Sequence, residues 1–574
     1  MPAAVVLVVS IAAFALAYRY YSGYLARRVY VLDPEFVTPA HTYRDGLDFV
    51  PTNKHIVFSH HFISVAGAAP IVGPATAVFW GWGPALLWVV VGTVFAAGVH
   101  DFGSLVVSVR HKARSIGTLT SEIITGRART LFLLIIFFLL TMVNAVFAVV
   151  IAQLFIQTPE AVLSVLLTIP LAIGVGQYVY RRRSVALVPA LVAMVLLYVS
   201  IPVGQVVPIT VDPLADLLAV SPQTLWIVLI FVYTFVSSRL PVWMLLQPRD
   251  YVNQMQMVLA LVVIILGVVV GWDSIVAPLV NDVPPDSPPW FPLLFVTIAC
   301  GAVSGFHSLV SSGTTAKQLN KETDARYVGY LASSGEGLLA LCSILACTAG
   351  VAATAGSWEG LYANFDTASE GATGYFVDGV AQFAHSLGVP VTFGTIFAAL
   401  VVISFAATSL DTAVRLQRYI VQEIADLAGV RPLARSVSGA TLIAVLIPLG
   451  IALLPGDFAF GTLWQLFGTT NQLTAALALA VVAVWVTKKN RNPIAVLIPW
   501  VFLVIMTSWA LVVQFRDFLT ADDPLQTFFL APLDAVIFVL ALWMVIEAAV
   551  AFRRAWRQRS GAGERTTVPA DEAR

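Results

Sequence analysis

The chain has 574 residues, of which 59% are hydrophobic and only 11% are charged, and its mean hydropathy is +0.87. Because soluble domains carry roughly twice that share of charged residues, this composition excludes a soluble globular protein and indicates a membrane protein with many spans. The 32 basic and 32 acidic residues give a formal net charge of zero, so no basic field would attract nucleic acid.

Apolar windows of about 20 residues, long enough to cross a bilayer, recur along the whole chain. They predict an all-α polytopic membrane protein with about fifteen transmembrane helices. The predicted spans are 3–22, 56–79, 84–109, 131–157, 161–180, 184–206, 224–247, 255–272, 291–313, 330–356, 390–410, 438–454, 461–487, 494–515 and 528–552.

The charges of the connecting loops alternate. Basic residues gather in every second loop, for example at Arg181–Arg183 and Lys488–Arg491, whereas the loops between them are acidic or uncharged, for example at Asp273–Asp286. Cytoplasmic loops carry an excess of Lys and Arg, so the pattern predicts an N-out, C-in topology. The arginines nearest the first span follow its apolar run, whereas a signal peptide carries basic residues before that run, so we expect a retained first span.

The stretch Ser59–Pro74, SHHFISVAGAAPIVGP, places two histidines, two glycines and two prolines inside a predicted span. In lipid, a broken helix is tolerated only where it lines a protein-walled or water-filled cavity. Such a break is the best pointer in a sequence to the binding site of a transporter. We therefore expect non-helical backbone near Gly67–Gly73, at the centre of the bilayer.

Several long motifs resemble the carbon starvation protein A (CstA) family. They are HHF and AGAAPIVGP within 60–74, HDF at 100–102, LPVW and PRDY within 240–251, TIACGAVSGFHSLVSSGTTAKQL at 297–319, ETDAR at 322–326 and LFGTTNQL at 466–473. The resemblance implies a secondary transporter of the amino acid–polyamine–cation superfamily in a prokaryotic plasma or inner membrane. It implies a LeuT-like inverted-repeat core and uptake of pyruvate or short peptides in carbon starvation. Longer members carry an insert where this chain has only the loop 357–389, so the chain resembles a short variant.

In a LeuT-like core the first and sixth helices are broken and run in opposite directions. If the core begins at span 56–79, its sixth helix is 224–247, which contains SSRLPVW. We therefore expect a second break near Ser238–Pro241 that faces the first. The expected organisation is an added N-terminal span and cytoplasmic loop at 1–55, a ten-helix transporter core at 56–420, four added spans at 421–552 and a basic, disordered cytoplasmic tail at 553–574.

The candidate substrate site lies at these two breaks. His60 and His61 could bind substrate or carry a proton, because imidazole titrates near neutral pH; the alternative is a pair of interfacial histidines bonded to the backbone. Exposed N–H groups at a half-helix N-terminus favour a carboxylate; close packing of small residues is the alternative. The residues expected there are Gly67, Ala68, Ala69, Pro70 and Gly73.

Arg239 is placed by the predicted topology deep in a span, where an unpaired charge is costly. We expect it to face the cavity and to bind a carboxylate through its planar fork, or to form a structural pair with an acid such as Glu336. Pro241 and Trp243 follow it and would wall the same site, although packing is the simpler role for the tryptophan.

The coupling ion is predicted to be H⁺ or Na⁺. Ser308, Ser311 and Ser312 share one helix face, and taking their span as the eighth core helix places them against carbonyls near Ala66 and Gly67, where oxygen ligands would suit Na⁺. The alternative is that these hydroxyls bond to their own helix and that His307 binds substrate or carries a proton.

Two other classes of protein stay open. A membrane-embedded metal- or His-dependent enzyme would need a ligand or nucleophile spacing such as HExxH or GxSxG, which the sequence lacks. A nutrient sensor would need a soluble output domain, and the tail is too short to fold alone. We expect no cofactor or bound metal, and as partners a small-molecule substrate, pyruvate or peptide, and the lipid bilayer; the oligomeric state is open.

Overall fold

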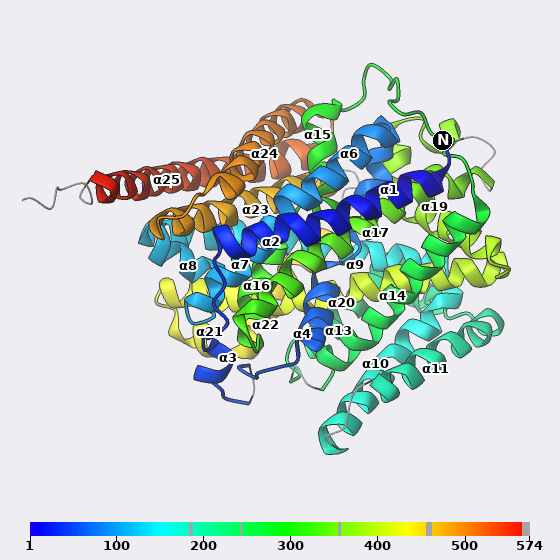
Figure 1. Cartoon of the computed structure of the whole chain (residues 1–574). Coiled ribbons are helices and arrows are strands. Elements are labelled where there is room, and N and C mark those ends of the chain that lie inside the picture. Colours follow the sequence, from blue (N-terminus) through cyan, green and yellow to red (C-terminus); the bar gives the residue numbers. More distant parts are fainter. Residues whose placement is uncertain (47, 183–186, 242–243, 354–357, 455–461, 565–574) are drawn as a thin grey trace, which may run out of the picture.

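The computed structural model in Figure 1 is helical throughout the described part of the chain and has no β-strand there beyond two isolated bridges. The structure describes residues 1–46, 48–182, 187–241, 244–353, 358–454 and 462–564. Within them, twelve helices are long and apolar enough to cross a membrane, or up to 14 if each of two bent pairs counts as a span. The predicted all-α polytopic class is therefore confirmed, while the number of spans and their orientation stay predictions.

Each predicted span coincides with a helix or with consecutive helices. The main helices are α1 (Ala3–Leu16), α4 (Lys54–Val65), α5 (Ala69–Ala77), α6 (Trp82–Gly92), α7 (Gly98–Arg110), α9 (Gly126–Gln157), α10 (Pro159–Arg182), α11 (Leu187–Val206), α13 (Pro222–Ser237), α14 (Leu246–Gly271), α15 (Trp290–Ile298), α16 (Phe306–Gly313), α17 (Leu331–Thr348), α20 (Val391–Leu427), α22 (Val437–Ala452), α23 (Thr462–Lys488), α24 (Ile494–Thr520) and α25 (Ala531–Glu564).

Shorter helices connect or extend these spans. They are α2 (Ser22–Tyr24), α3 (Pro39–Thr42), α8 (Ile116–Ile123), α12 (Asp212–Leu218), α18 (Trp358–Leu361), α19 (Phe365–Ser386) and α21 (Arg431–Arg435). The described residues also include five π-helical segments: η1 (Ala17–Tyr21), η2 (Leu25–Val29), η4 (Thr93–Ala97), η8 (Arg326–Tyr330) and η11 (Gln526–Leu530).

Two spans are interrupted near their middle and run antiparallel to each other. The first consists of α4 and α5, the second of α15 and α16. Thr52, before α4, donates its N–H to Gln318 just after α16, while Trp80, after α5, accepts from Asn281, which precedes α15. The start of each interrupted span therefore lies beside the end of the other.

Long helices surround this pair. The helices α9 and α20 pack along each other, and α13 and α22 pack against both of them. The side chain of Gln417 on α20 donates to the hydroxyl of Thr141 on α9 at 2.7 Å, which ties these two long helices together inside the core. These four helices form a scaffold on one side of the interrupted spans.

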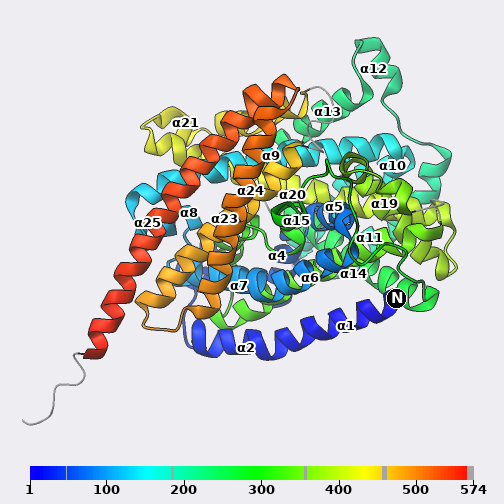
Figure 2. The same cartoon turned by 90° about the horizontal axis from the view of Figure 1, so that it is seen from above.

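Other helices lie at the edge of the molecule. Figures 1 and 2 show α1 and α2 along one outer face and α24 and α25 along another. The α10–α11 hairpin projects from the bundle in Figure 1, and a small separate apolar cluster, which includes Val175, Leu197 and Val252, joins it to α14. These helices thus lie around the two interrupted spans, α4–α5 and α15–α16, and not between them.

Some expectations about the loops are wrong. The loop expected at 357–389 contains α19, a 22-residue helix whose inner face packs on α5, α14 and α20. The loop before α15 is non-helical up to the start of that helix at Trp290. The helix α25 continues to Glu564, so the first part of the expected disordered tail is helical, and residues 565–574 lie outside the described residues.

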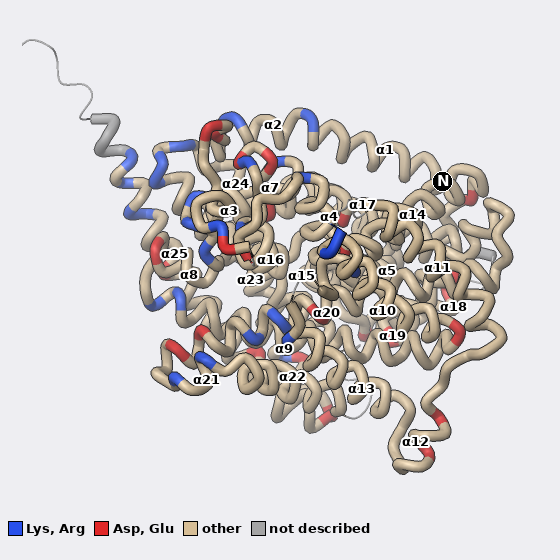
Figure 3. The backbone as a smooth tube through the Cα atoms, turned by 90° about the horizontal axis from the view of Figure 1, so that it is seen from below, with Lys and Arg blue, Asp and Glu red and all other residues tan. Residues whose placement is uncertain are grey.

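Lys and Arg are concentrated at one end of the bundle, whereas acidic residues occur at both ends (Figure 3). In Figure 3, Lys and Arg gather around α2, α8, α21 and the far end of α25, while acidic residues mark the surroundings of the N-terminus, α12 and α18. This distribution agrees with the alternation of loop charges in the sequence. The end around α2, α8 and α21 is called the basic end below.

Candidate functional site

The first interruption is three residues long, from Ala66 to Ala68. Asn53 caps the start of α4 by accepting from the backbone N–H of His55, and the helix ends after Val65, where Ala66 leaves helical geometry at φ −82° and ψ 70°. Pro70 stands in the first turn of α5, where its missing N–H leaves no helical bond unmade. The predicted break is confirmed at Gly67 but is shorter than expected, since Gly73 and Pro74 lie inside α5.

The second interruption lies between α15 and α16, at 299–305. Ala299 adopts φ 38° and ψ −107°, a conformation that strains a non-glycine residue and that proteins retain mainly at functional positions. The backbone is also non-helical at Ser238–Pro241, as expected, but this stretch follows the end of α13, and the span that α5 crosses is α15–α16, so 224–247 was the wrong partner span. The counting from 56–79 included the peripheral α10–α11 hairpin, so it arrived at α13 two helices too early.

The half-helix α5, which follows the first interruption, meets the second interruption in the interior. A Cβ added at Gly73 would lie 2.5 Å from the carbonyl oxygen of Thr297 and 2.8 Å from that of Ile298, and one added at Gly301 would lie 2.9 Å from Pro74. Glycine is thus required where α5 crosses the end of α15. Gly73 contributes this close approach rather than a free N–H group.

The half-helices α5 and α16 both begin at this centre, but their N-termini differ. The side chain of Asn471 on α23 accepts from the backbone N–H of Phe306 at 3.1 Å, and its backbone carbonyl accepts from Gly305 at 3.0 Å. The residue before α5, Ala68, has no polar side chain with which to cap it. Of the two positive dipole ends, that of α5, at Ala69 and Pro70, has no side-chain cap among the described residues.

A fully buried cluster of ionisable side chains lies beside the second interruption. His307, the second residue of α16, has Nδ1 2.7 Å from Asp101 Oδ2 and Nε2 3.1 Å from Glu336 Oε2. His100 bonds the other oxygen of Asp101 at 2.7 Å, and the Ser333 hydroxyl donates to Asp101 Oδ2 at 2.7 Å. One imidazole on a broken half-helix is thus held between carboxylates from α7 and α17.

The contact with Glu336 differs from the contact with Asp101. The His307–Asp101 contact is a hydrogen bond, whereas the His307–Glu336 contact lies within ion-pair distance but off the hydrogen-bonding direction. The other oxygen of Glu336, Oε1, has no hydrogen-bond partner within the described chain. A small displacement of α16 relative to α17 would make or break the Glu336 contact.

The two histidines of α4 are buried, as a functional role requires. His60 Nδ1 lies 2.9 Å from Asp250 Oδ2 on α14, and its Nε2 lies 3.2 Å from the Thr314 hydroxyl. His61 Nδ1 bonds the Thr315 hydroxyl at 2.9 Å. Neither histidine is an interfacial one bonded to the backbone; both join α4 to the segment that follows α16.

The serine hydroxyls of α16 are used locally. The hydroxyl of Ser308 donates to the carbonyl of Gly305 and that of Ser312 to the carbonyl of Ser308, both at 2.7 Å, while Ser311 Oγ is buried without a partner in the described structure. The side chain that lies against Gly67 is Ser409 of α20, whose Oγ would be 2.5 Å from an added Cβ. The expected placement of the α16 serines on an eighth core helix is therefore wrong, because α16 is half of the second broken span.

Arg239 does not face a cavity. It lies after the end of α13, its side chain is exposed, and its guanidinium sits 5.3 Å from the centre of the Phe235 ring. Pro241 is exposed as well, and Trp243 lies outside the described residues. The expectation that Arg239 pairs in the core is wrong because α13 ends at Ser237, several residues before the end of the predicted span.

Arg249, which was not singled out from the sequence, is buried near the end of α13. Its guanidinium forms an ion pair with Asp411 of α20 and donates to the hydroxyl of Tyr233 at 2.6 Å. The hydroxyl of Ser237 donates to the other oxygen of Asp411 at 2.7 Å. The sequence did contain a signal for Arg249: an ionisable residue within a predicted span, or at its edge, is by default a candidate functional residue.

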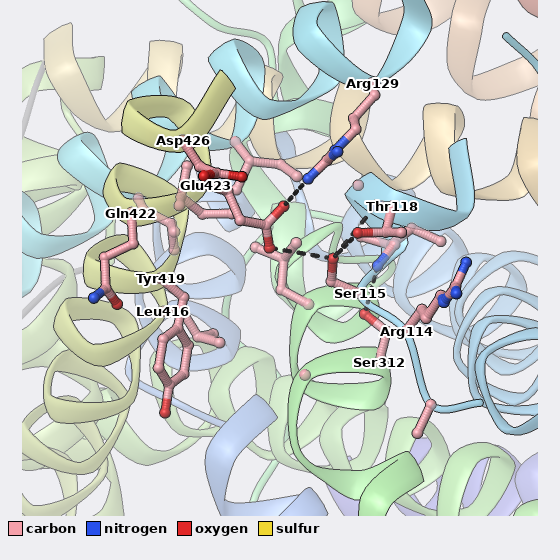
Figure 4. A pocket seen from close by; sticks show the side chains of 18 of the residues that line it. Arg114, Ser115, Thr118, Arg129, Ser312, Leu416, Tyr419, Gln422, Glu423 and Asp426 are labelled. Carbon is pink, nitrogen blue, oxygen red and sulfur yellow. Dashed lines mark hydrogen bonds and ion pairs between the residues drawn. The ribbon is translucent and has the colours of Figure 1, made fainter. Parts of the chain in front are cut away.

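A pocket of about 700 Å³ leads from the basic end toward α16. Figure 4 shows Ser312 beside Ser115 at this pocket, and Glu423 between Ser115 and Arg129, with which it pairs at 3.3 Å. It is lined from α8, α9, α16, α20 and α21, and its basic side chains, which outnumber its acidic ones, are Arg114, Arg129, Lys317, Arg431 and Arg435. This pocket is called the vestibule below.

Ser312 also closes the inner end of the vestibule. Its Oγ accepts the backbone N–H of Ile116 on α8 at 3.0 Å, and the residues of both interruptions are buried. The vestibule therefore ends at α16, short of the interruptions. Within the described residues, no group of three or more His, Cys, Asp or Glu side chains is arranged to hold a metal ion.

Comparison with known proteins agrees with the motifs. The family model "Carbon starvation protein CstA" matches residues 2–352 and 349–510. The chain belongs to the carbon starvation protein CstA family. It is a multi-pass cell-membrane protein, as the apolar helices and the bacterial relatives of this family indicate.

Curated CstA-family relatives carry the names of transporters. The chain is similar to the pyruvate/proton symporter BtsT of Escherichia coli, with 33% identity over 88% of this chain and 81% of that one. It is 34% identical to the peptide transporter CstA of Campylobacter jejuni over 88% and 79% of the two chains. It is 30% identical to the peptide transporter CstA of Bacillus subtilis over 98% of both, so the short form is shared.

Among solved structures, the chain is matched to the Eremococcus coleocola manganese transporter, with 12% identity, 89% and 99% of the two chains covered and a TM-score of 0.48. MhsT in complex with L-phenylalanine has 11% identity, covers 87% and 99% of the two chains and has a TM-score of 0.49.

Proposed function

We propose that this CstA-family protein is a proton-coupled symporter that imports a small carboxylate, pyruvate or a short peptide, across the cell membrane. The observation that carries the proposal is the position of His307: it lies at the start of a broken half-helix, fully buried, between two carboxylates on neighbouring helices. Such a group can gain or lose a proton and change the helix contacts that hold the interruption.

The proton step follows from the charges around His307. As an imidazolium it offers two N–H donors, one for Asp101 and one for Glu336; as a neutral imidazole it can donate to only one of them. Loss of the proton thus removes the attraction that holds α16 to α17. Because Ser312 of α16 also closes the inner end of the vestibule, a movement of α16 that follows proton loss from His307 can open the vestibule as well.

The substrate site is proposed at the start of α5. The uncapped N–H groups around Ala69 and the positive end of the helix dipole favour a carboxylate, and the basic lining of the vestibule raises the local concentration of anions. His60 and His61 lie on the other half of the same span, within its last turns. The names of the relatives add pyruvate and peptides as candidate substrates.

A sodium-coupled mechanism is the second candidate, favoured by one observation. The hydroxyls of Ser64 and Ser409 are buried without partners in the described part of the chain, and Ser409 lies against Gly67 at the first interruption. Oxygen ligands of this kind suit a hard cation. The serines of α16 would not take part, apart from Ser311.

We infer a revised division of the chain from the packing. The first five core helices would be α4–α5, α6–α7, α9, α13 and α14, and the second five α15–α16, α17, α20, α22 and α23. Equivalent members pack in equivalent ways: α17 lies on α5 as α7 lies on α16, and α14 contacts α4 as α23 contacts α15. Such an inverted repeat supports a LeuT-like core, with the α10–α11 hairpin inserted and with α1, α24 and α25 added.

The test is uptake into proteoliposomes of labelled pyruvate and of labelled dipeptides, with pH and sodium gradients imposed separately. The proposal expects accumulation driven by an inside-alkaline pH gradient without sodium. Accumulation with a sodium gradient alone would select the second candidate, and uptake that responds to neither gradient would overturn the symporter. Competition by pyruvamide tests the carboxylate: it should compete roughly 10- to 100-fold more weakly than pyruvate, because it cannot form charge-assisted hydrogen bonds.

A further inference from the structure

A groove of about 940 Å³ runs between the N-terminal helix and the α17 span, on the outer face of the bundle. Figure 2 shows α1 and α2 at the edge of the molecule, so this groove faces the surrounding lipid. Apolar side chains line its length, and three arginines lie at the basic end of the molecule. The residues that carry the argument are Ile11, Phe14 and Leu338 along the groove and Arg19, Arg27 and Arg326 at its end.

The three arginines lack acidic partners among the described residues, and no acidic side chain lines the groove. The Arg326 guanidinium is held in place by hydrogen bonds to the Tyr18 carbonyl at 2.6 Å and the Ser22 hydroxyl at 2.8 Å. Arg19 and Arg27 are exposed and Arg326 is partly buried, so an anion can reach these guanidiniums, which form strong charge-assisted hydrogen bonds with anionic groups.

Two of these guanidiniums converge on one glycine. A Cβ added at Gly23 would lie 3.5 Å from Nη2 of Arg27 and 3.8 Å from Nη2 of Arg326. The absence of a side chain at Gly23 leaves open the space that both arginines face. An anionic group of a few atoms, such as a phosphate, fits this arrangement of donors.

Each of the three arginines lies on a π-helical segment. Arg19 belongs to η1, Arg27 to η2 and Arg326 to η8. Such segments are rare in proteins and concentrate at functional sites, where the wider turn changes the direction of side chains. Three of them around one groove indicate that the direction of these arginines is built into the fold.

We propose that this groove binds an anionic phospholipid, with the headgroup phosphate between Arg19, Arg27 and Arg326 and an acyl chain along Ile11, Phe14 and Leu338. A soluble anion would leave the apolar length of the groove uncovered, and a neutral lipid would leave the arginines unpaired. Basic pockets between transmembrane helices bind acidic headgroups by this combination of charge and apolar contact. The site is separate from the proposed transport pathway and does not depend on it.

The experiment measures lipid retention by the full-length protein in detergent, by native mass spectrometry, with phosphatidylglycerol and phosphatidylcholine of identical acyl chains. The double variant Arg19→Gln/Arg27→Gln should lose phosphatidylglycerol affinity by roughly 25-fold, about fivefold for each arginine near the surface. The control Arg28→Gln/Arg44→Gln removes the same charge from nearby positions outside the groove and should change the affinity by less than about twofold.

A second variant keeps all charges. Gly23→Leu fills the space between the guanidiniums and should weaken phosphatidylglycerol retention as strongly as the double variant, while the thermal unfolding temperature stays unchanged. Equal retention of both lipids by the unmodified protein, equal losses in the control and groove variants, or competition by glycerol phosphate as strong as that by the whole lipid would each overturn the proposal.

Discussion

At the scale of single residues, buried ionisable groups do two different kinds of work in this protein. Arg249 and Asp411 neutralise each other, and the hydroxyls of Tyr233 and Ser237 satisfy the oxygens of the carboxylate. His307 carries at most one positive charge but contacts two carboxylates, those of Asp101 and Glu336. The net charge of this cluster therefore changes when a proton is gained or lost. The first arrangement is suited to holding helices together, the second to exchanging a proton.

The His307 cluster gives the first prediction. His307→Gln keeps a hydrogen-bond donor for Asp101 but cannot carry a proton, so accumulation driven by a pH gradient should fall to background while counterflow of labelled pyruvate continues. His385→Gln, an exposed histidine of α19, is the control and should leave both assays unchanged. Full pH-driven accumulation in the His307 variant would place the proton site elsewhere.

The Arg249–Asp411 pair gives a prediction about stability. Asp411→Asn leaves a buried guanidinium without its counter-ion and should lower the free energy of unfolding by about 3–5 kcal/mol, measured by thermal and denaturant unfolding in detergent. Arg249→Met/Asp411→Leu removes both charges and should be less destabilising than the single change. Glu122→Gln breaks the partly exposed Arg114–Glu122 pair and should cost no more than about 1 kcal/mol; an equal cost for both single variants would contradict this account.

At the scale of elements, the interruptions of the two antiparallel spans depend on glycines that tolerate no side chain. Gly67 approaches the side chain of Ser409, whereas Gly73 approaches the backbone of Thr297 and Ile298. A side chain can be shortened by mutation, but a backbone carbonyl cannot. The two glycines should therefore respond differently to the same substitution.

We predict that Gly67→Ala and Gly73→Ala each destabilise the protein by about 1–3 kcal/mol through overpacking. Ser409→Gly removes both atoms that the new Cβ would meet most closely, so Gly67→Ala/Ser409→Gly should recover much of the loss, while Ser409→Gly should not help Gly73→Ala. Gly450→Ala, with open space around the added methyl group, is the control. Unfolding midpoints measure these effects, and equal rescue of both glycine variants would refute the packing argument.

The spans and the first interruption could be predicted from the sequence because both depend on residues that are neighbours in the chain: runs of apolar residues for the spans, and the Gly and Pro residues at 67–74 for the interruption. The second interruption was misplaced because 299–305 has glycines but no proline, whereas Pro241 drew attention to what is the end of α13. The His307 cluster was out of reach for a different reason. Asp101 lies 206 residues from His307 in the chain, and hydropathy does not say which buried groups of distant spans meet.

At the scale of the whole molecule, the end of the bundle where Lys and Arg gather is also the end at which the vestibule opens. The vestibule opens among Arg114, Arg129 and the residues of α21, at the end of the bundle that carries the basic loops. Since basic loops face the cytoplasm, the structure would correspond to a carrier whose pathway leads inward, with its centre closed at α16. This orientation is open to a direct test.

The last prediction is that Asp426, at the vestibule, lies on the cytoplasmic side and that Asp212, at the start of α12, lies outside. Both side chains are exposed, whereas the three native cysteines are buried, so a membrane-impermeant maleimide should react little with the unmodified protein. Asp426→Cys should react in inverted vesicles but not in intact cells, and Asp212→Cys should show the opposite pattern. Because the two positions are compared in the same preparations, leaky membranes would appear as reaction of both variants on both sides. A consistent reversal would show that the charge of the loops does not set the orientation of this protein and that the vestibule opens outward.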